Sequence, residues 1–588
     1  MQRGFLQSLT APREGRFSFV SAICFTGAFL LVLSWLTSEH FLPWVSWHAE
    51  VLAFAATFIV ALGLAVTGLR SASMFRIRVP LLAVPFAFLG TMALVQVLAG
   101  TLAFRGDAIA FCFYMALGVV CIVLGFNTAS PPPSSSERVT PARWDPPSWV
   151  ALAFVAGSIA SVIVALAQVF ELWELSAWIL RMPELRRPGA NLGQPNQLAT
   201  LLVMGIASVA YLHVWGKLGR TVAAWLVLLL CIGLALSESR SGALGLMALL
   251  VWWQWKRKAI ANQVSLWAAP AVAAVFIALY LAWPQVLNAL QLSDSQAANR
   301  FTQGDLRMAM WSQLLEAIWL KPWWGWGVLQ VPEAHNAVAH AHRVNNPFSY
   351  SHNLILDLAV WMGVPIAVGL TIVAIGWAVR RSRAIDRLLP WFCIAVAVPL
   401  ATHSMLELPF AYAYFLAPVL YLLGLLEASV QARSFASVAS RTAAATLAVV
   451  ACLMFWSVIE YLSIEEDFRV VRFEQLRIGK TPEHQRKPNV VMFTQLGALL
   501  DGSRIALEPD MSSEKLELLR RVAMRYPWVA TQYRYALALA LNGNPSEAAR
   551  QFQVIRWQRD EKLYASIKRE VAELARSRYP QLRILALP

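Results

Sequence analysis

The sequence predicts an all-α polytopic membrane protein with about 13 transmembrane helices. Of its 588 residues, 58% are hydrophobic and only 14% are charged, against about 45–50% and about 25% in soluble domains. Apolar stretches recur along most of the chain, and clusters of Lys and Arg separate them. This composition excludes a soluble enzyme, and the 11% aromatic content excludes a disordered chain.

The predicted spans are apolar stretches of about 20 residues, the length that crosses a bilayer as a helix. They lie near residues 17–36, 49–69, 79–99, 108–126, 148–170, 197–215, 221–237, 242–255, 264–283, 353–379, 389–405, 410–426 and 442–461.

Basic residues fix the predicted orientation, because Lys and Arg collect in cytoplasmic connections. Arg3, Arg13 and Arg16 precede the first span, so we expect the N-terminus in the cytoplasm. Every second connection is then basic, with Arg70/Arg76/Arg78, Arg138/Arg143, Lys217/Arg220, Lys256/Arg257/Lys258, Arg380/Arg381/Arg383/Arg387 and Arg433/Arg441. The predicted cytoplasmic connections therefore account for most of the net charge of +15. A nucleic-acid partner is not needed to explain this charge.

Two long polar segments fall on the outer side by this topology. We expect a transmembrane domain over residues 1–461 with an outer loop at about 284–352, and an outer helical domain over 462–588. Residues 128–147 are typical of a flexible cytoplasmic linker. In the tail, a helical hairpin with a break at 542–545 is compatible with a tetratricopeptide-like unit or with an ordinary hairpin; its small and large residues are Tyr535, Ala536, Leu539, Ala540, Gly543, Ala548, Ala549 and Phe552.

Two groups of candidate ligand-binding residues lie on the outer side, at predicted helix starts. Asn191, Gln194 and Asn196 precede the sixth span and present amide donors and acceptors; the alternative is that they only cap the helix. Arg240 stands in the turn 237–242, where a guanidinium beside a helix N-terminus suits phosphate oxygens. The alternative for Arg240 is an arginine that snorkels to the membrane surface.

The outer loop holds the next candidates. Arg307 and Trp311 are four residues apart and share one face of a predicted helix. The aromatic turn 321–327 suits a boundary between water and lipid, so an interfacial helix without substrate contact is the alternative. His335, His340 and His342 lack the spacing of a zinc site.

The loop ends in Tyr350, His352 and Asn353, just before the tenth span. An imidazole near neutral pH can accept a proton from a hydroxyl, although a structural histidine at a helix start is the alternative. His403 and Glu407 close the eleventh span, where the carboxylate either orients an imidazole or meets water.

These groups together suit a substrate that is both lipid and anion, such as a polyprenyl diphosphate. Guanidinium groups would stabilise the departing diphosphate, since a hydrogen bond to a charged group contributes about 1.5–3 kcal/mol. A positioned base would add about 10²–10⁴-fold in rate. The residues thus favour glycosyl transfer from a lipid carrier.

The same residues resemble a known family. The segments that carry the resemblance are NLGQPNQLA (191–199), SESRSG (237–242), Arg307 with Trp311, 322–327, His352-Asn353 and HSMLELP (403–409). They look like the bacterial pilin-type protein O-oligosaccharyltransferases, within the superfamily of O-antigen ligases and polymerases. The resemblance covers the membrane part, most firmly residues 185–410, and implies a membrane glycosyltransferase fold of the GT-C type.

The resemblance implies that an oligosaccharide moves en bloc from undecaprenyl diphosphate to a Ser or Thr of a periplasmic or pilin protein, without a metal or other cofactor. It implies that His352 is catalytic and that Arg240 and Arg307 hold the diphosphate. Some relatives carry a second histidine where this chain has Tyr350. The expected location is the bacterial inner membrane, with the site and the C-terminus in the periplasm.

The remaining candidates receive subsidiary roles in this scheme. Asn191, Gln194 and Asn196 are expected to contact the donor, and the supporting residues are Trp311, Tyr350, Asn353, His403 and Glu407.

Two alternative functions stay open at this point. An O-antigen ligase or polymerase would use much the same site with a lipid A core or glycan acceptor. A lipid transporter or flippase would place its ionisable groups near the bilayer midplane, whereas here they cluster at one side.

Overall fold

We describe a computed structural model of the chain, over residues 19–69, 76–128, 144–182, 187–260, 264–292, 304–342, 347–481 and 485–587. Several features named above lie outside these residues: Arg3, Arg13, Arg16, Arg70, Arg138, Arg143, most of the linker 128–147, and the side chain of His340.

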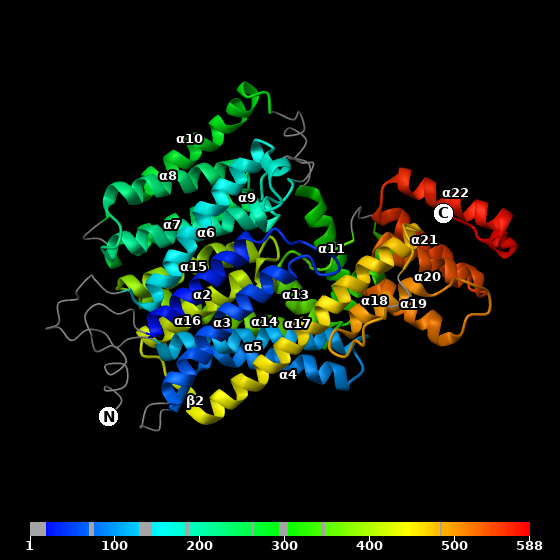
Figure 1. The fold of residues 1–588 in the computed structure, drawn as a ribbon, viewed down its shortest axis with the longest axis horizontal. Helices are drawn as coiled ribbons and strands as arrows, with labels where there is room; N and C mark the ends of the chain where they lie inside the picture. Colours follow the sequence, from blue (N-terminus) through cyan, green and yellow to red (C-terminus); the bar gives the residue numbers. More distant parts are fainter. Residues whose placement is uncertain are drawn as a thin grey trace. The chain divides into compact units, whose positions relative to one another are not determined.

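The all-α membrane architecture is confirmed (Figure 1). Within the described ranges, nine helices are long and apolar enough to cross a membrane, and three shorter apolar helices accompany them. Every stretch predicted to span is mainly helical where it is described, although some ends are not, such as residues 79–80 in β1 (Arg76–Pro80) and residues 264–267 before α10 (Ala268–Ala289), and one stretch is divided between two helices. The stretch 353–379 is two helices, α13 (Leu354–Met362) and α14 (Val364–Arg383). They separate at Gly363, whose φ of 84° is left-handed and favours glycine.

The chain divides into two compact units. Unit 1 comprises residues 1–88, 114–298 and 374–454, and unit 2 comprises residues 89–113, 299–373 and 455–588. The elements wholly in unit 1 are α2 (Phe19–Leu36), α3 (Trp47–Leu69), β1 (Arg76–Pro80), α6 (Pro146–Val169), α7 (Pro195–Val214), α8 (Arg220–Leu236), α9 (Arg240–Trp255), α10 (Ala268–Ala289), α15 (Leu388–Ser404), α16 (Ala413–Ser429) and β2 (Ser434–Ala439).

Unit 2 holds the helices of the outer loop and of the tail. They are α11 (Gly304–Leu320), α12 (Val331–Val338), α13, α18 (Thr494–Arg504), α19 (Ser513–Arg525), α20 (Val529–Leu541), α21 (Pro545–Gln558) and α22 (Glu561–Ser577). The boundary between the units falls inside four helices: α4 (Val84–Leu98), α5 (Arg105–Thr128), α14 and α17 (Ser440–Leu476).

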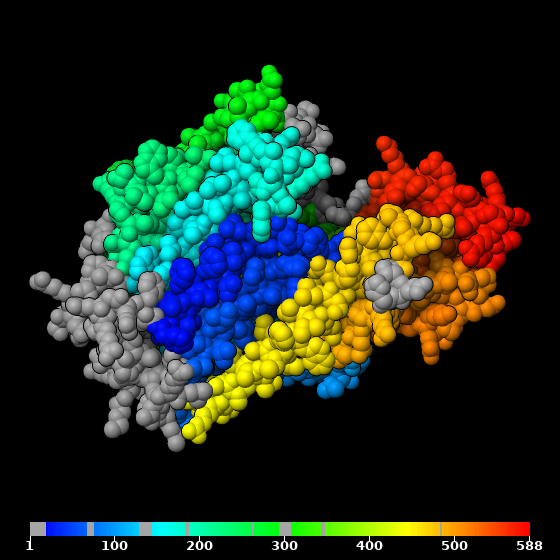
Figure 2. Space-filling model, viewed as in Figure 1, coloured from blue at the N-terminus to red at the C-terminus, as the bar shows by residue number. Residues whose placement is uncertain are grey.

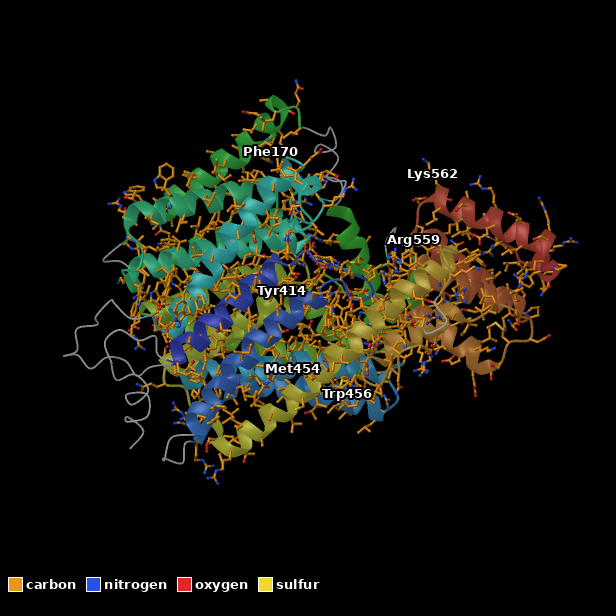
Figure 3. All side chains as sticks on the ribbon, viewed as in Figure 1. Phe170, Tyr414, Met454, Trp456, Arg559 and Lys562 are labelled. Carbon is orange, nitrogen blue, oxygen red and sulfur yellow. The ribbon has the colours of Figure 1, made fainter. Side chains whose placement is uncertain are left out.

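Helix α7 forms the core of unit 1. Of its membrane-length window, 89% is buried, and it packs against α6, α8, α9 and α15. Gly205 allows this close packing, because a Cβ there would overlap the Ser158 hydroxyl. Tyr414 of α16, labelled in Figure 3, donates a hydrogen bond to Gln197 Oε1 at 2.8 Å. The first turn of α7 is thus held at a fixed place.

Contacts between connections support the alternation of sides in unit 1. Strands β1 and β2 come from two connections predicted to be cytoplasmic, and they pair antiparallel with Arg76 opposite Ala439. Lys256, from a third such connection, donates to the carbonyl oxygens of Arg383 and Ile385 at 3.4 and 3.5 Å. Within each of these two pairs, the basic connections lie together, which agrees with the predicted alternation.

The tail helices pack around their own apolar core in unit 2. Helices α20 and α21 form the predicted hairpin, with Gly543 at a φ of 82° between them. Tyr535, Ala536 and Phe552 are buried in this core, whereas Arg559 and Lys562, labelled in Figure 3, mark the polar end of α21 and the start of α22. The structure therefore confirms the hairpin.

Helix α17 extends beyond the predicted span 442–461, to Leu476. Only 6% of its apolar window is buried, and Figure 2 shows its surface uncovered over much of its length. Trp456 on this helix is 47% exposed, as expected for a side chain that faces lipid. The polar last turns continue the helix with local ion pairs such as Arg469 with Glu466.

Candidate functional site

The first polar cluster, in unit 1, joins the ends of three helices. We call Asn196, Thr200, Ser239, His403 and Glu407 the amide cluster. The Ser239 hydroxyl donates to Asn196 Oδ1 at 2.7 Å, and Asn196 Nδ2 donates to Glu407 Oε1 at 3.4 Å. Thr200 Oγ1 lies 2.8 Å from His403 Nδ1. These bonds fix the starts of α7 and α9 against the end of α15.

The close approach of α7 and α9 explains why this cluster forms. A Cβ on Gly242 would overlap the Cβ of Ala199, so only glycine allows the two helices to cross there. Ser239 caps α9 by accepting a hydrogen bond from Gly242 N at 2.9 Å, a common capping arrangement. The motifs 191–199 and 237–242 thus meet because small residues stand at the crossing.

Arg240 is the first residue of α9, and its side chain is exposed. Within the described part of the chain its guanidinium has no ion pair or hydrogen-bond partner. Free backbone N–H groups at a helix N-terminus and an uncommitted guanidinium both attract anions. Arg240 is therefore available to bind phosphate oxygens.

A second arginine shapes the turn before α9. Arg187 donates to the carbonyl oxygens of Ser237 and Glu238 at 2.9–3.1 Å. Glu238 has a φ of 46°, a left-handed conformation that is costly for a residue with a side chain. We did not predict this role for Arg187, because the sequence does not show which carbonyl groups a guanidinium reaches.

Asn191 and Gln194 differ in how the structure uses them. Asn191 Nδ2 donates to the carbonyl oxygens of Leu36 and Trp178 at 2.6 and 2.7 Å, and its Oδ1 accepts from Leu180 N at 3.0 Å. This buried amide bonds to three backbone groups of the fold, and its expected contact with the donor stays a prediction. Gln194 is half-buried at the N-cap of α7 without a side-chain capping bond, so its amide does not cap the helix.

The second polar cluster, in unit 2, is a tight turn around His352. We call residues 350–353 the histidine turn. His352 is half-buried and has a φ of 58°, a strained conformation that persists only where the surroundings enforce it. Ser351 N donates to Asp357 Oδ1 at 2.7 Å, and Ser351 Oγ donates to the Asn353 carbonyl at 2.7 Å. Asn353 caps α13 through Ile355 N and Leu356 N.

Helix α11 fastens to this turn. Trp311 Nε1 donates to the Ser351 carbonyl at 2.8 Å, directly beside His352. Arg307 is half-buried one helical turn earlier, about 6 Å along the helix. Trp311 thus holds Arg307 near the histidine turn, and the shared helix predicted for these two residues is confirmed. Tyr350 packs edge-on against Trp361, with ring centroids 6.0 Å apart.

The aromatic turn combines anchored and exposed rings. Trp326 is buried, donates to the Ala317 carbonyl at 2.8 Å and lies under Lys321 at 4.0 Å. Trp323 and Trp324 are 72% and 73% exposed. Exposed indoles on a rigid turn suit a membrane interface, as predicted for this segment.

Comparisons with known proteins bear on both clusters. A family model described as "O-Antigen ligase" matches residues 225–371, and one described as "Protein glycosylation ligase" matches residues 188–213. A third, "Virulence factor membrane-bound polymerase, C-terminal", matches residues 391–571. Arg240, Arg307, the histidine turn and the start of α7 lie within the first two matches.

Two curated relatives come from Acinetobacter baylyi. A "General O-oligosaccharyltransferase" is 24% identical over 538 residues, covering 89% of this chain and 90% of the relative. A "ComP-specific O-oligosaccharyltransferase" is 25% identical over 467 residues, covering 76% and 80%. The chain is therefore similar to O-oligosaccharyltransferases and to the O-antigen ligase superfamily.

Similarity to O-oligosaccharyltransferases gives each of the two clusters a candidate role. The sequence motifs predicted that both are functional, and the structure shows how each is held. It also reveals supporting roles that the sequence did not assign, for Arg187, Thr200 and Asp357.

Proposed function

We propose that this protein transfers a preassembled oligosaccharide en bloc from undecaprenyl diphosphate to a Ser or Thr hydroxyl of a periplasmic or pilin protein. One observation carries the proposal. The histidine turn presents a single imidazole in an enforced conformation, fastened by Trp311 to the helix that bears Arg307, in a chain related to O-oligosaccharyltransferases.

The histidine turn supplies the base in this scheme. His352 accepts the proton of the acceptor hydroxyl as its oxygen bonds to the anomeric carbon of the sugar. The bond from that carbon to the diphosphate oxygen breaks, and the electron pair leaves with the diphosphate. A positioned base contributes about 10²–10⁴-fold, and the rigid turn lowers the entropy cost of that positioning.

The arginines stabilise the leaving group. Arg240 and Arg307 each offer a planar fork of donors to diphosphate oxygens, and the N-terminus of α9 adds its dipole. The amide cluster holds Arg240 in place by fixing the first turn of α9. With this source of positive charge, we propose that the reaction needs no metal, so activity should survive prior treatment with EDTA.

The proposed setting is the bacterial inner membrane, with both clusters on the periplasmic side. The supporting evidence is the alternation of basic connections and the contacts among those connections in unit 1. Cysteine accessibility at positions in the outer loop and in the basic connections tests this orientation.

The direct test uses purified protein, an undecaprenyl-diphosphate-linked oligosaccharide and a candidate pilin, followed by intact-mass measurement. We expect the pilin mass to increase by one whole oligosaccharide. The matches to ligase and polymerase models make lipid A core and glycan the competing acceptors. Transfer to either of these, and none to protein, would overturn the choice of acceptor.

A further inference from the structure

Unit 2 contains a cavity of about 570 Å³ that the proposed chemistry does not use. Its walls come from residues 102–105 before and at the start of α5, residues 487–490, and helices α18 and α19. The volume falls in the range of pockets for small ligands, about 300–1,000 Å³. A site for part of a second substrate therefore fits here.

The cavity walls are held together by specific bonds. Glu460 of α17 accepts hydrogen bonds from the backbone N–H groups of Met492 and Phe493 at 2.8 and 2.7 Å. Gly106 N donates to Thr494 Oγ1 at 3.0 Å, and a Cβ on Gly106 would overlap Gln495. The cavity is thus a feature of the folded unit with fixed walls.

The lining of the cavity is cationic. Arg105, Lys487 and Arg521 line it against one carboxylate, Asp501, which pairs with Lys487. Arg521 lies over the ring of Phe104 at 4.5 Å. Its Nε atom is buried and has no hydrogen-bond partner among the residues described. A donor held in this way favours an anionic group in the cavity.

The backbone of residues 487–490 favours a peptide occupant. Within the described structure, this segment is neither helix nor strand. The N–H groups of Lys487, Asn489 and Val490 and the C=O groups of all four residues have no hydrogen-bond partner there, and Pro488 has no N–H. Another peptide backbone can satisfy such donors and acceptors together, whereas a lipid headgroup lacks the amide donors.

We propose that this cavity binds a segment of the acceptor protein that carries an Asp or Glu side chain. The carboxylate would reach Arg521 and Arg105, and the main chain would pair with residues 487–490. This inference rests on the proposed function, because it assumes a protein acceptor. It assigns acceptor selection to a place separate from the histidine turn.

The test measures peptide binding in the absence of any lipid-linked donor. The probe is a fluorescein-labelled nonapeptide with one serine flanked by two glutamates, and its glutamine analogue is the comparison. By fluorescence anisotropy with the full-length protein in detergent, we expect the glutamate peptide to bind at least tenfold more tightly. Arg521→Gln should weaken that binding about tenfold, as loss of one charge-assisted hydrogen bond predicts.

Two further variants separate binding from folding. Arg520→Gln is the matched control. Arg520 is next to Arg521 on α19, but its side chain pairs with Glu517 and does not line the cavity. The affinity of this variant for the peptide should equal that of the wild type. Asp501→Asn removes the one carboxylate among the described residues of the lining. It should tighten binding about threefold, a gain that misfolding cannot produce.

Equal binding of both peptides, or unchanged affinity in Arg521→Gln and Asp501→Asn, would overturn the proposal. So would displacement of the glutamate peptide by phosphatidylglycerol vesicles but not by unlabelled peptide, because the site would then be a lipid site. A protein that transfers oligosaccharide without binding the peptide contradicts only the cavity assignment. One that binds the peptide but transfers nothing contradicts the proposed function.

Discussion

At the scale of single residues, the chain commits some polar side chains to the fold and leaves others for a ligand. The side-chain amide of Asn191 forms hydrogen bonds with three backbone groups. The exposed guanidinium of Arg240, in contrast, has no hydrogen bond or ion pair within the described chain. The two residues lie in neighbouring motifs, yet only the second can meet an anion at no cost to the fold.

Arg240→Gln should lower kcat/KM for the lipid-linked donor about 10- to 100-fold, because one charge-assisted contact to the diphosphate is lost. Arg240→Lys should recover part of this loss, since it restores charge without the planar fork. Arg181→Gln is the control, as an exposed arginine of the preceding connection. Steady-state kinetics of oligosaccharide transfer measure all three, and an Arg240→Gln enzyme with wild-type donor use would contradict the assignment.

His335 makes stability depend on pH. It is buried against Phe348, and burial, with a smaller contribution from His342, lowers its pKa to about 3. Because the unfolded state binds the proton first, stability should fall as the pH drops from about 6.5 towards 3, by at most about 1.4 kcal/mol per unit. Thermal unfolding at several pH values should show a smaller acid loss in His335→Phe; an identical pH profile in both proteins would refute this contribution.

At the scale of elements, helix ends build the site. The starts of α7 and α9 and the end of α15 meet in the amide cluster, and the start of α13 carries the histidine turn. Helix ends leave backbone donors and acceptors unsatisfied, so polar side chains collect there. Glycines and small residues set how closely these ends approach.

Gly242→Ala should separate α7 from α9, because the new Cβ overlaps that of Ala199. We expect a loss of about 1–3 kcal/mol in stability and a larger donor KM, since Arg240 shifts with α9. Ala199→Gly in the same chain should restore part of both. Gly369→Ala, where a Cβ meets nothing within 4 Å, is the control. Equal melting temperatures and donor KM values in Gly242→Ala and Gly369→Ala would show that the crossing is not tight.

The sequence predicted the elements better than the contacts between them. Apolar length located the helices, and the spacing of Arg307 and Trp311 placed them on one helix. The break at Gly363 escaped prediction, because apolar residues continue on both sides of it. It depends on tertiary contacts, such as the hydrogen bond from Val364 N to the Pro322 carbonyl at 2.7 Å.

The candidate site was predicted to a similar degree. The motifs and the resemblance indicated His352, Arg240 and Arg307, because few residue types can act as a base or bind a diphosphate. They did not separate the amide of Asn191 from that of Asn196, because the sequence does not show that Asn191 bonds to backbone groups and Asn196 to the side chains of Ser239 and Glu407. Domain boundaries and the roles of the site residues remain predictions.

At the scale of the whole molecule, distant parts of the chain form unit 2. Asp107 at the start of α5 is fully buried and pairs with Arg525 of α19 at 2.9 Å, although 418 residues separate them. Gln330 donates to the same carboxylate at 3.1 Å. One buried ion pair thus joins the first part of the membrane chain, the outer loop and the tail.

Arg525→Leu should destabilise unit 2 by about 3–5 kcal/mol, because it leaves the Asp107 carboxylate buried without its partner. Limited proteolysis should then cleave the tail faster than in the wild type. Arg520→Leu, which removes only an exposed ion pair with Glu517, should cost no more than about 1 kcal/mol. Equal cleavage rates in the two variants would show that the pair does not hold the tail.

The central claim is that the imidazole of His352 activates the acceptor hydroxyl, and a comparison of His352→Ala with His352→Asn in the purified transfer reaction tests it most directly. Both variants should insert into the membrane and bind lipid-linked oligosaccharide with wild-type affinity, yet add no oligosaccharide to the pilin by intact mass. Transfer at the wild-type rate by either variant would contradict the account.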